Sequence, residues 1–318
     1  MTSQTANLAF VFPGQGSQTV GMGRDWYEQT DLGRAIFDRA DETLGFPLSR
    51  ICFQGPEEEL KKTYHAQPGL FVCSVIALEY LKGEGIEPAV VAGHSLGEYS
   101  ALYAAGVFDL ATGLNLIRTR GEAMGEAAET HPGTMAAAIG FDPARIEAIC
   151  SDIRRDGGIV QAANFNSLSQ TVVSGERVAV ERAVELLKST GARHVVMLPV
   201  HGAFHSPLMD SAVPKMQAAL AAANLANPKV PFLANAEGGY LTDAAAIRAS
   251  LARQITSCVR WSDIMSKIAA RGVGSVIEVG PGRVLSGLWR QNGSSIPARA
   301  CGKVEEARAL VQEVRSLS

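Results

Sequence analysis

The chain has 318 residues, with 29 basic and 32 acidic side chains, and 47% of its residues are hydrophobic. This composition can form a full core and excludes a disordered chain. The net charge of -3 provides no basic surface for nucleic acid or for an anionic membrane.

We see no pattern of a targeting signal, of a membrane span or of a C-x-x-C motif in the sequence. The longest mostly apolar run, Gly69 to Leu78, is far shorter than the roughly 20 residues that span a bilayer. The first charged residue is Arg24, so no secretory or transit signal is visible. The five cysteines form no C-x-x-C pair, which predicts buried free thiols rather than a metal or redox site. We therefore expect a soluble protein of the cytoplasm.

Short apolar runs alternate with helical patterns along most of the chain. The runs that we expect to be strands are Leu8–Phe12, Ala89–Ala92, Val195–Val200, Pro231–Ala234 and Ser275–Val279. Continuous apolar strands separated by helices are typical of a parallel sheet that is covered on both faces. The sequence therefore predicts an α/β protein with a mostly parallel sheet.

One stretch has a different order of elements. Strands are predicted at Thr134–Ile139, Ile159–Asn164, Gln170–Ser174 and His194–Leu198, with helices at Asp142–Arg155 and Val178–Ser189. The order βαββαβ is that of a ferredoxin-like module. We expect an inserted small domain at 128–199 and a discontinuous large domain formed by 1–127 and 200–318. The crevice between two such domains is the usual place for a site.

The segment Gly93-His94-Ser95-Leu96-Gly97 follows a predicted strand and precedes a helical pattern. A G-x-S-x-G pattern on a strand–turn–helix is typical of a nucleophile elbow. The glycines flank the serine because the turn is tight and leaves no room for Cβ atoms. The turn also directs the next backbone N–H groups at a developing oxyanion. Ser95 is therefore the candidate nucleophile.

A serine nucleophile needs a base, and the chain has six histidines. His94 neighbours Ser95 but is expected to point away from it on the turn. His194 begins a strand of the insert and is expected at the surface. His201 and His205 lie in a loop after a predicted strand, where sites occur in open α/β sheets. Spacing alone does not choose between these two.

A glycine-rich loop, Gly14 to Gln18, follows the first predicted strand. It contains neither G-x-G-x-x-G nor Gly-Lys-Ser/Thr, so a phosphate site is not favoured. It is better interpreted as a loop that donates a second backbone N–H to an oxyanion hole. The segment Gly280-Pro281-Gly282, after the last predicted strand, is interpreted as a structural turn.

A predicted helix that begins after Asp109 carries two arginines, Arg118 and Arg120. Ile117, Arg120 and Met124 fall on one face of this helix. A guanidinium on a face that points to the core needs a carboxylate or phosphate partner. That partner is either a substrate anion or a structural salt bridge.

Taken together, these motifs resemble those of the malonyl-CoA:acyl carrier protein transacylases, relatives of polyketide acyltransferase domains. The matching segments are Gly-Gln-Gly-Ser-Gln at 14–18, Gly-His-Ser-Leu-Gly-Glu at 93–98, Arg-Gly-x-x-Met at 120–124, Phe-His-Ser at 204–206 and Gln-x-x-x-x-Val-Arg-Trp at 254–261. They cover nearly the whole chain. The resemblance implies an α/β-hydrolase-like large domain with a ferredoxin-like insert.

The resemblance also implies a role for each matching residue. Ser95 would be the nucleophile, and His205 rather than His201 the base. Arg120 matches the arginine that pairs with the free malonyl carboxylate. Gln15 and Leu96 match the backbone N–H donors of the oxyanion hole. Gln254 would orient His205 through its main-chain carbonyl. Further residues of the implied pocket are Met124, Phe204 and His94.

The implied reaction is a ping-pong transfer of malonyl from malonyl-CoA to acyl carrier protein for fatty acid synthesis. It needs no metal or redox cofactor, because the coenzyme A thioester is the substrate. The resemblance further implies a monomer, and a basic surface near the cleft for an acidic carrier protein. The candidates for that surface are Lys61, Lys62, Lys215, Arg271, Arg283 and Arg290.

Phe204 resembles the malonyl-selective members, whereas methylmalonyl-selective relatives commonly carry a smaller residue. The chain departs from polyketide domains at Gly202-Ala203, where they often have His-Ala. This departure favours the free-standing bacterial enzymes and leaves selectivity resting on one side chain.

Two other functions remain alternatives. A patatin-like serine hydrolase shares the elbow, and Asp156-Gly157-Gly158 resembles its Asp-Gly-Gly partner, although a plain glycine turn is favoured there. Arg120 argues against a hydrolase of neutral esters, which has no use for a pocket arginine. A non-catalytic module that binds acyl carrier protein is the third alternative, which the intact Ser95, His205 and Gln15 disfavour.

Overall fold

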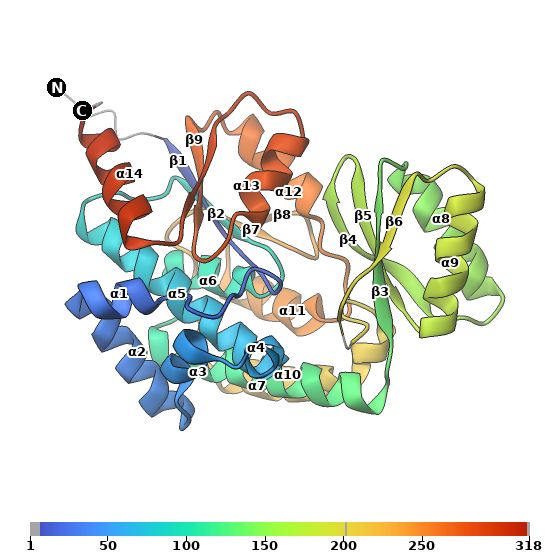
Figure 1. Ribbon diagram of the computed structural model, residues 1–318, viewed down its shortest axis with the longest axis horizontal. Coiled ribbons are helices and arrows are strands. Elements are labelled where there is room, and N and C mark those ends of the chain that lie inside the picture. Colours follow the sequence, from blue (N-terminus) through green and yellow to red (C-terminus); the bar gives the residue numbers. More distant parts are fainter. Residues whose placement is uncertain (1–6, 201, 317–318) are drawn as a thin grey trace.

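The computed structural model describes residues 7–200 and 202–316 of the chain. It contains a six-stranded sheet in the order β10-β9-β1-β2-β7-β8 and a separate four-stranded sheet (Figure 1). The strands of the larger sheet are β1 (Leu8–Phe12), β2 (Val90–Gly93), β7 (Phe232–Ala234), β8 (Gly239–Leu241), β9 (Ser275–Val279) and β10 (Ala298–Cys301). All neighbours pair in parallel except β7 and β8. The predicted α/β fold with a mostly parallel sheet is confirmed.

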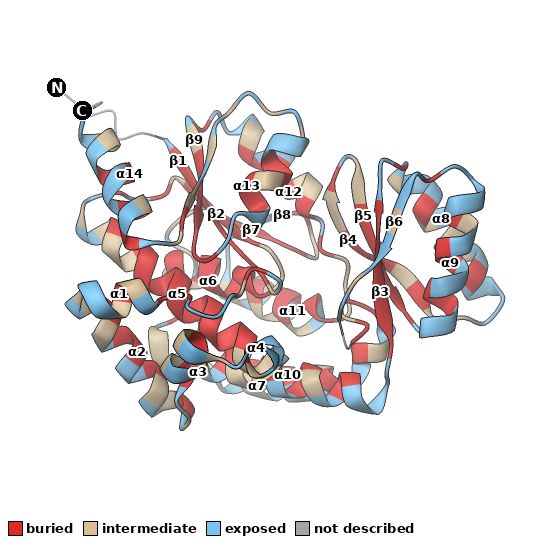
Figure 2. Cartoon of the chain, in the orientation of Figure 1, coloured by how far each residue is buried: buried red, intermediate tan, exposed pale blue. Residues whose placement is uncertain are grey.

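The core lies on both faces of this sheet because successive strand side chains point in opposite directions. In β1, Phe10 and Phe12 belong to one hydrophobic cluster and Ala9 and Val11 to the other. Buried residues of the strands meet the inward faces of the helices, whose outer faces are exposed (Figure 2). The strands are therefore covered on both sides, as the mostly apolar runs in the sequence predict.

The cluster that contains Phe10 and Phe12 is formed with most of the helices, and the cluster that contains Ala9 and Val11 is formed with α12 and α13. The helices outside the smaller sheet are α1 (Arg24–Gln29), α2 (Asp31–Leu44), α3 (Leu48–Gln54), α4 (Glu57–Lys61), α5 (Thr63–Gly83), α6 (Gly97–Ala104), α7 (Leu110–Thr130), the 3₁₀ helix η1 (Pro207–Ala212), α10 (Val213–Ala222), α11 (Ala244–Gln254), α12 (Trp261–Ala270), α13 (Val284–Gln291) and α14 (Val304–Ser316). None of the helices in the described ranges is long and apolar enough to cross a membrane. All five cysteines are free thiols, and only Cys258 is not fully buried.

The smaller sheet is antiparallel, with the order β4-β5-β3-β6. Its elements are β3 (Thr134–Ile139), α8 (Pro143–Arg155), β4 (Val160–Ser167), β5 (Gln170–Gly175), α9 (Arg177–Ser189) and β6 (His194–Met197). The predicted order βαββαβ is confirmed, and the Asp142 side chain caps α8 by accepting from Ala144 N at 3.0 Å. The last strand is shorter than predicted, because β6 ends at Met197 rather than at Leu198 or Val200.

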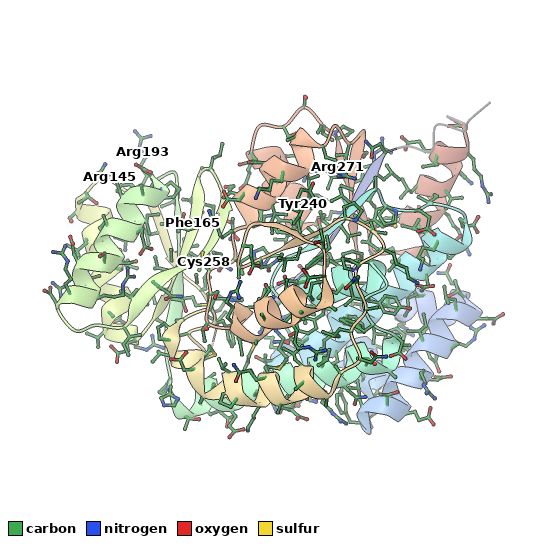
Figure 3. The ribbon with its side chains drawn as sticks, turned by 180° about the vertical axis from the view of Figure 1, so that it is seen from behind. Arg145, Phe165, Arg193, Tyr240, Cys258 and Arg271 are labelled. Atoms are coloured by element: carbon green, nitrogen blue, oxygen red, sulfur yellow. The ribbon has the colours of Figure 1, made fainter. Side chains whose placement is uncertain are left out.

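The two sheets are joined where β4 meets the segment after α11. Asn164 forms a parallel bridge with Val259, and Phe165 N donates to Val259 O at 2.9 Å. Figure 3 shows Phe165 and Cys258 at this junction. We propose that the smaller unit has the boundaries expected from the sequence, 128–199, with the first boundary in the last turn of α7.

Candidate active site

Ser95 lies in the turn between β2 and α6, at the carboxyl edge of the larger sheet. Its backbone is left-handed, with φ 52°. A Cβ atom on Gly93 would lie 1.8 Å from the carbonyl oxygen of Gly97, and one on Gly97 would lie 2.0 Å from that of Phe12. Both flanking positions therefore require glycine, as the nucleophile-elbow interpretation predicts.

His205 is the histidine that meets Ser95. Its Nε2 is 2.8 Å from Ser95 Oγ, and its Nδ1 lies 3.0 Å from the carbonyl oxygen of Gln254 and 3.1 Å from that of Ser257. Carbonyl oxygens only accept, so this network assigns the Nδ1–H tautomer and leaves Nε2 to accept the serine proton. His201, the other candidate base, lies outside the described residues.

The smaller sheet helps to hold His205 in place. Gln161 on β4 donates from Nε2 to the carbonyl oxygen of His205 at 2.6 Å and to that of Thr256 at 3.0 Å. Like Ser95, His205 has a left-handed backbone, with φ 57°. The single amide of Gln161 thus ties the loop of His205 to the segment that also holds its ring.

His205 is buried, with 3% of its surface exposed. Burial, followed by the nearby positive charge of Arg120, lowers the pKa of His205 to about 3. The neutral imidazole, which can act as a base, is therefore the form that persists into acidic solution.

We expect the rate of serine acylation to fall on the acidic side with a midpoint well below 6.5, the ordinary pKa of histidine. The sign follows from the lowered pKa, since protonation of His205 is disfavoured until the solution is strongly acidic. The check is the pH dependence of the acylation step in rapid-quench experiments, with circular dichroism to show that the fold persists. A midpoint at or above 6.5 would contradict this environment for His205.

Arg120 lies on α7 beside the serine and is 1% exposed. Its Nη2 donates to Ser95 Oγ at 3.1 Å and to Gln254 Oε1 at 2.9 Å, and its Nη1 donates to Gln67 Oε1 at 2.8 Å. The guanidinium carbon lies 5.6 Å from the centre of the Tyr99 ring. Arg118, by contrast, is half-buried and donates to Asn115 at 3.2 Å.

No carboxylate within 4.0 Å neutralises Arg120 in the part of the chain that the structure describes. Burial lowers the pKa of this guanidinium, but an arginine remains charged in a protein. The alternative of a structural salt bridge therefore finds no partner in the described ranges. A buried cation directed at the serine oxygen suits a substrate that carries its own anion close to its reacting carbonyl.

Two further buried residues, Asn235 and Glu98, hold the turn that carries Ser95 in place. Asn235, just after β7, accepts from Ser95 N at 2.7 Å and donates to Gly93 O at 2.7 Å. Glu98 accepts from Asn235 N at 3.1 Å and from Gln254 Nε2 at 2.6 Å. Burial raises the pKa of Glu98 to about 8. Sequence reasoning missed both: Glu98 was visible only as part of the 93–98 motif, and Asn235 only as a polar residue after a predicted strand.

The predicted oxyanion donors lie in the two segments that meet at Ser95. Phe12 at the end of β1 is paired with Gly93, and its carbonyl accepts from His94 N at 3.0 Å. Gly14 is so close to this turn that a Cβ atom on it would lie 2.4 Å from His94 O. Gln15 follows directly, and Leu96 is the N-cap residue of α6.

The remaining predicted pocket residues lie next to residues of this centre in the sequence or one helical turn away. His94 points away from Ser95, as expected, and its Nε2 lies 2.8 Å from Asn166 Oδ1. Met124 is buried, and its sulfur lies 3.7 Å from Gln67 Nε2. Phe204 is half-buried, and a Cβ atom on Gly202 would lie 2.9 Å from its ring. Glycine at 202 therefore leaves room for the Phe204 ring, which accounts for the departure seen in the sequence.

Other sequence candidates lie outside this centre. Asp156 is at the surface, where it pairs with Arg182 at 2.7 Å. Gly280 and Gly282 form a turn with φ 129° and 90°. His194 is exposed, as predicted.

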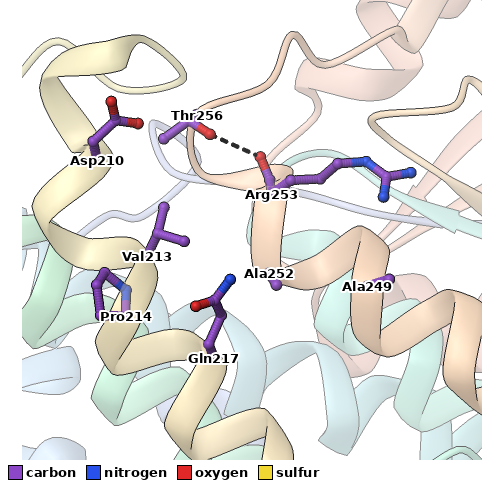
Figure 4. Close-up of a pocket in the computed structure, with 8 residues that line it drawn as sticks. All are labelled: Asp210, Val213, Pro214, Gln217, Ala249, Ala252, Arg253 and Thr256. Carbon is purple, nitrogen blue, oxygen red and sulfur yellow. Dashed lines mark hydrogen bonds between the residues drawn. The ribbon is translucent and has the colours of Figure 1, made fainter.

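A pocket of about 500 Å³ lies beside the end of α11, next to Arg253 and Thr256 (Figure 4). Its lining residues come from η1, α10, α11 and the turn after α11, and include Asp210, Arg253 and Thr256. Ser95, His205 and Arg120 do not line it. It is therefore distinct from the serine centre.

The geometry defines a class of enzyme that forms an ester on serine. A serine at a glycine elbow is hydrogen-bonded to a buried neutral histidine, and the histidine is oriented by main-chain carbonyls rather than by a carboxylate. This arrangement supports nucleophilic attack on an acyl group.

Comparisons with known proteins agree with this class. Residues 9–311 match the family described as "Acyl transferase domain". The malonyl CoA-acyl carrier protein transacylases of Bacillus subtilis and Escherichia coli are each 41% identical, over 98% and 96% of this chain and 98% and 99% of their own. An acyl-carrier-protein S-malonyltransferase from Bartonella henselae has a TM-score of 0.93 and 41% identity, covering 97% of this chain and 99% of that one. The chain belongs to the acyl transferase family, in its malonyl-CoA:acyl carrier protein transacylase branch.

Proposed function

We propose that the protein transfers the malonyl group of malonyl-CoA to the phosphopantetheine thiol of acyl carrier protein, through an ester on Ser95. The observation that carries this proposal is Arg120, a buried guanidinium that donates to Ser95 Oγ at 3.1 Å. The names of the relatives at 41% identity support the same substrate and acceptor. The product would supply extender units for fatty acid synthesis.

In the first half-reaction, His205 Nε2 takes the proton of Ser95 Oγ as the oxygen attacks the thioester carbonyl. The backbone N–H groups of Gln15 and Leu96 stabilise the oxyanion of the tetrahedral intermediate. The carbon–sulfur bond then breaks, and coenzyme A leaves with the proton that His205 had taken. Malonyl-Ser95 remains.

In the second half-reaction, the carrier thiol gives its proton to His205 and attacks the ester carbonyl. The carbon–oxygen bond to Ser95 breaks, and His205 returns the proton to the serine oxygen. Throughout, the carbonyl of Gln254 holds the Nδ1–H of the ring at 3.0 Å. Arg120 binds the malonyl carboxylate in both half-reactions, and Met124, Phe204 and His94 complete the pocket.

The carrier protein must reach the carboxyl edge of the larger sheet. A solved structure with a TM-score of 0.92 and 37% identity is that of a type II polyketide acyl carrier protein in complex with its malonyl-transacylase. Arg271 precedes β9 and so lies at the opposite edge from Ser95 (Figure 3). Of the six basic candidates, those that remain for the docking surface are Lys61, Lys62, Lys215, Arg283 and Arg290. The free thiols fit a reducing compartment, and we propose a cytoplasmic monomer.

The direct test is intact-protein mass spectrometry after mixing with malonyl-CoA, and again after adding holo acyl carrier protein. We expect one malonyl adduct that the carrier then removes and carries. The control is Ser95→Ala, which should form no adduct.

The other functions predict other outcomes. A serine hydrolase would lose the adduct to water without a carrier. A non-catalytic module would bind the carrier and form no adduct at all. Either result would refute the proposed transfer.

A further inference from the structure

Glu98 is a fully buried carboxyl group close to the nucleophile. It is 0% exposed and lies on α6, one turn after Ser95. No basic side chain of the described residues lies within ion-pair distance of it. Burying a carboxyl group without an ion pair is costly, so its hydrogen bonds must account for its presence.

Those hydrogen bonds fix the orientation of the Gln254 side chain. The Gln254 amide donates from Nε2 to Glu98 Oε2 at 2.6 Å and to the carbonyl oxygen of Ser95 at 2.8 Å. An amide has one end that donates and one that accepts, and the two ends are similar in shape. The Ser95 carbonyl only accepts, and Glu98 accepts through Oε2, so the NH₂ end faces these two oxygens and the amide oxygen faces the other way.

The oxygen of Gln254 faces Arg120, whose Nη2 donates to it at 2.9 Å. The same Nη2 reaches Ser95 Oγ at 3.1 Å. A neutral amide oxygen anchors the guanidinium without cancelling its charge, so the charge remains available to an anion next to the serine. The reversed amide would instead present its NH₂ group to the guanidinium, and the anchor would be lost.

We propose that Glu98 is a positioning residue for substrate selection: by accepting from the NH₂ end of the Gln254 amide, together with the Ser95 carbonyl, it holds the oxygen end against Arg120 and so aims the guanidinium at the acyl carboxylate. This inference rests on the proposed malonyl transfer. It assigns Glu98 a part in choosing the acyl group, separate from its support of the elbow through Asn235.

Glu98→Gln tests this with little change of shape. The backbone N–H of Asn235 is fixed and donates to Glu98 Oε1 at 3.1 Å, so the new amide should turn its oxygen to that donor. Its NH₂ group then faces the NH₂ group of Gln254, so the Gln254 amide keeps only the Ser95 carbonyl as an acceptor and its hold on Arg120 is weakened. We expect the ratio of malonyl to acetyl acylation of Ser95 to fall roughly 10-fold, a loss of the size of one hydrogen bond to a charged group.

Two more variants complete the experiment. Gln254→Met removes the amide but keeps the main-chain carbonyl that meets His205, and it should lower the same ratio. Glu278→Gln is the matched control, because Glu278 is also 0% exposed and accepts two backbone hydrogen bonds, from Leu285 and Ser286. It should leave the ratio unchanged. Thermal unfolding of each variant measures how much folding stability the substitution removes. If Glu98→Gln does not fold, Gln254→Met provides the test.

The outcomes separate this inference from the proposed function. A wild-type protein that takes up no malonyl group refutes the proposed function and the inference with it. A malonyl-selective wild type whose ratio is unchanged in Glu98→Gln or in Gln254→Met refutes the inference alone. Equal losses on malonyl-CoA and acetyl-CoA would mean that Glu98 only supports the elbow.

Discussion

Replacing His205 by alanine should slow acylation of Ser95 roughly 10⁴-fold, the upper range for loss of a general base. The serine proton would have no acceptor at the 2.8 Å position that Nε2 occupies. The same loss would apply to the return half-reaction, since one imidazole serves both. Single-turnover kinetics with malonyl-CoA measure the effect on the first step directly.

Two other histidines provide the comparison. His194→Ala removes an exposed imidazole from the smaller sheet and should leave the rate unchanged. His201→Ala should be mild, because the base is assigned to His205. If His201→Ala greatly slowed acylation of Ser95 and His205→Ala slowed it only slightly, the assignment of the base would be wrong.

Arg120→Ala should reduce malonyl transfer by roughly 10²- to 10³-fold, the usual cost of truncating one partner of a buried charge pair. In the variant, the malonyl carboxylate would be buried without a cation. An acetyl group has no carboxylate and no longer leaves an arginine unpaired, so acetyl-CoA should become the relatively better substrate. The kcat/KM values for the two thioesters give the ratio.

Arg118→Ala is the matched control for this change. Arg118 is on the same helix, is half-buried and has Asn115 as its partner. Its replacement should leave the ratio of the two substrates at the wild-type value. Equal losses of malonyl and acetyl transfer in Arg120→Ala would contradict the pairing of Arg120 with the malonyl carboxylate.

The strands of the larger sheet were predictable where their sequence is mostly apolar. Leu8–Phe12 and Ser275–Val279 have the predicted bounds. The edge strands Gly239–Leu241 and Ala298–Cys301 were missed because each is short and only partly buried, so neither has an apolar run. Their position comes from pairing with a neighbouring strand, which no local pattern encodes.

The candidate site was predictable where chemistry requires one residue type in a local motif. The elbow glycines around Ser95 are of this kind. The choice of His205 needed the family resemblance, because the contact joins residues 110 positions apart. Glu98, Asn235 and Gln161 were not found, because their roles depend on contacts between separate segments that only the folded chain brings together.

Ser95 and His205 are the non-glycine residues with a left-handed backbone in the described part of the chain. Such a conformation costs on the order of 1–3 kcal/mol at each residue, which the surrounding hydrogen bonds must offset. Glycine at either position would relieve the strain and remove the chemistry. A search for thermostable variants that ignores activity would therefore be drawn to these two positions, so stabilisation of this enzyme has to be sought elsewhere in the chain.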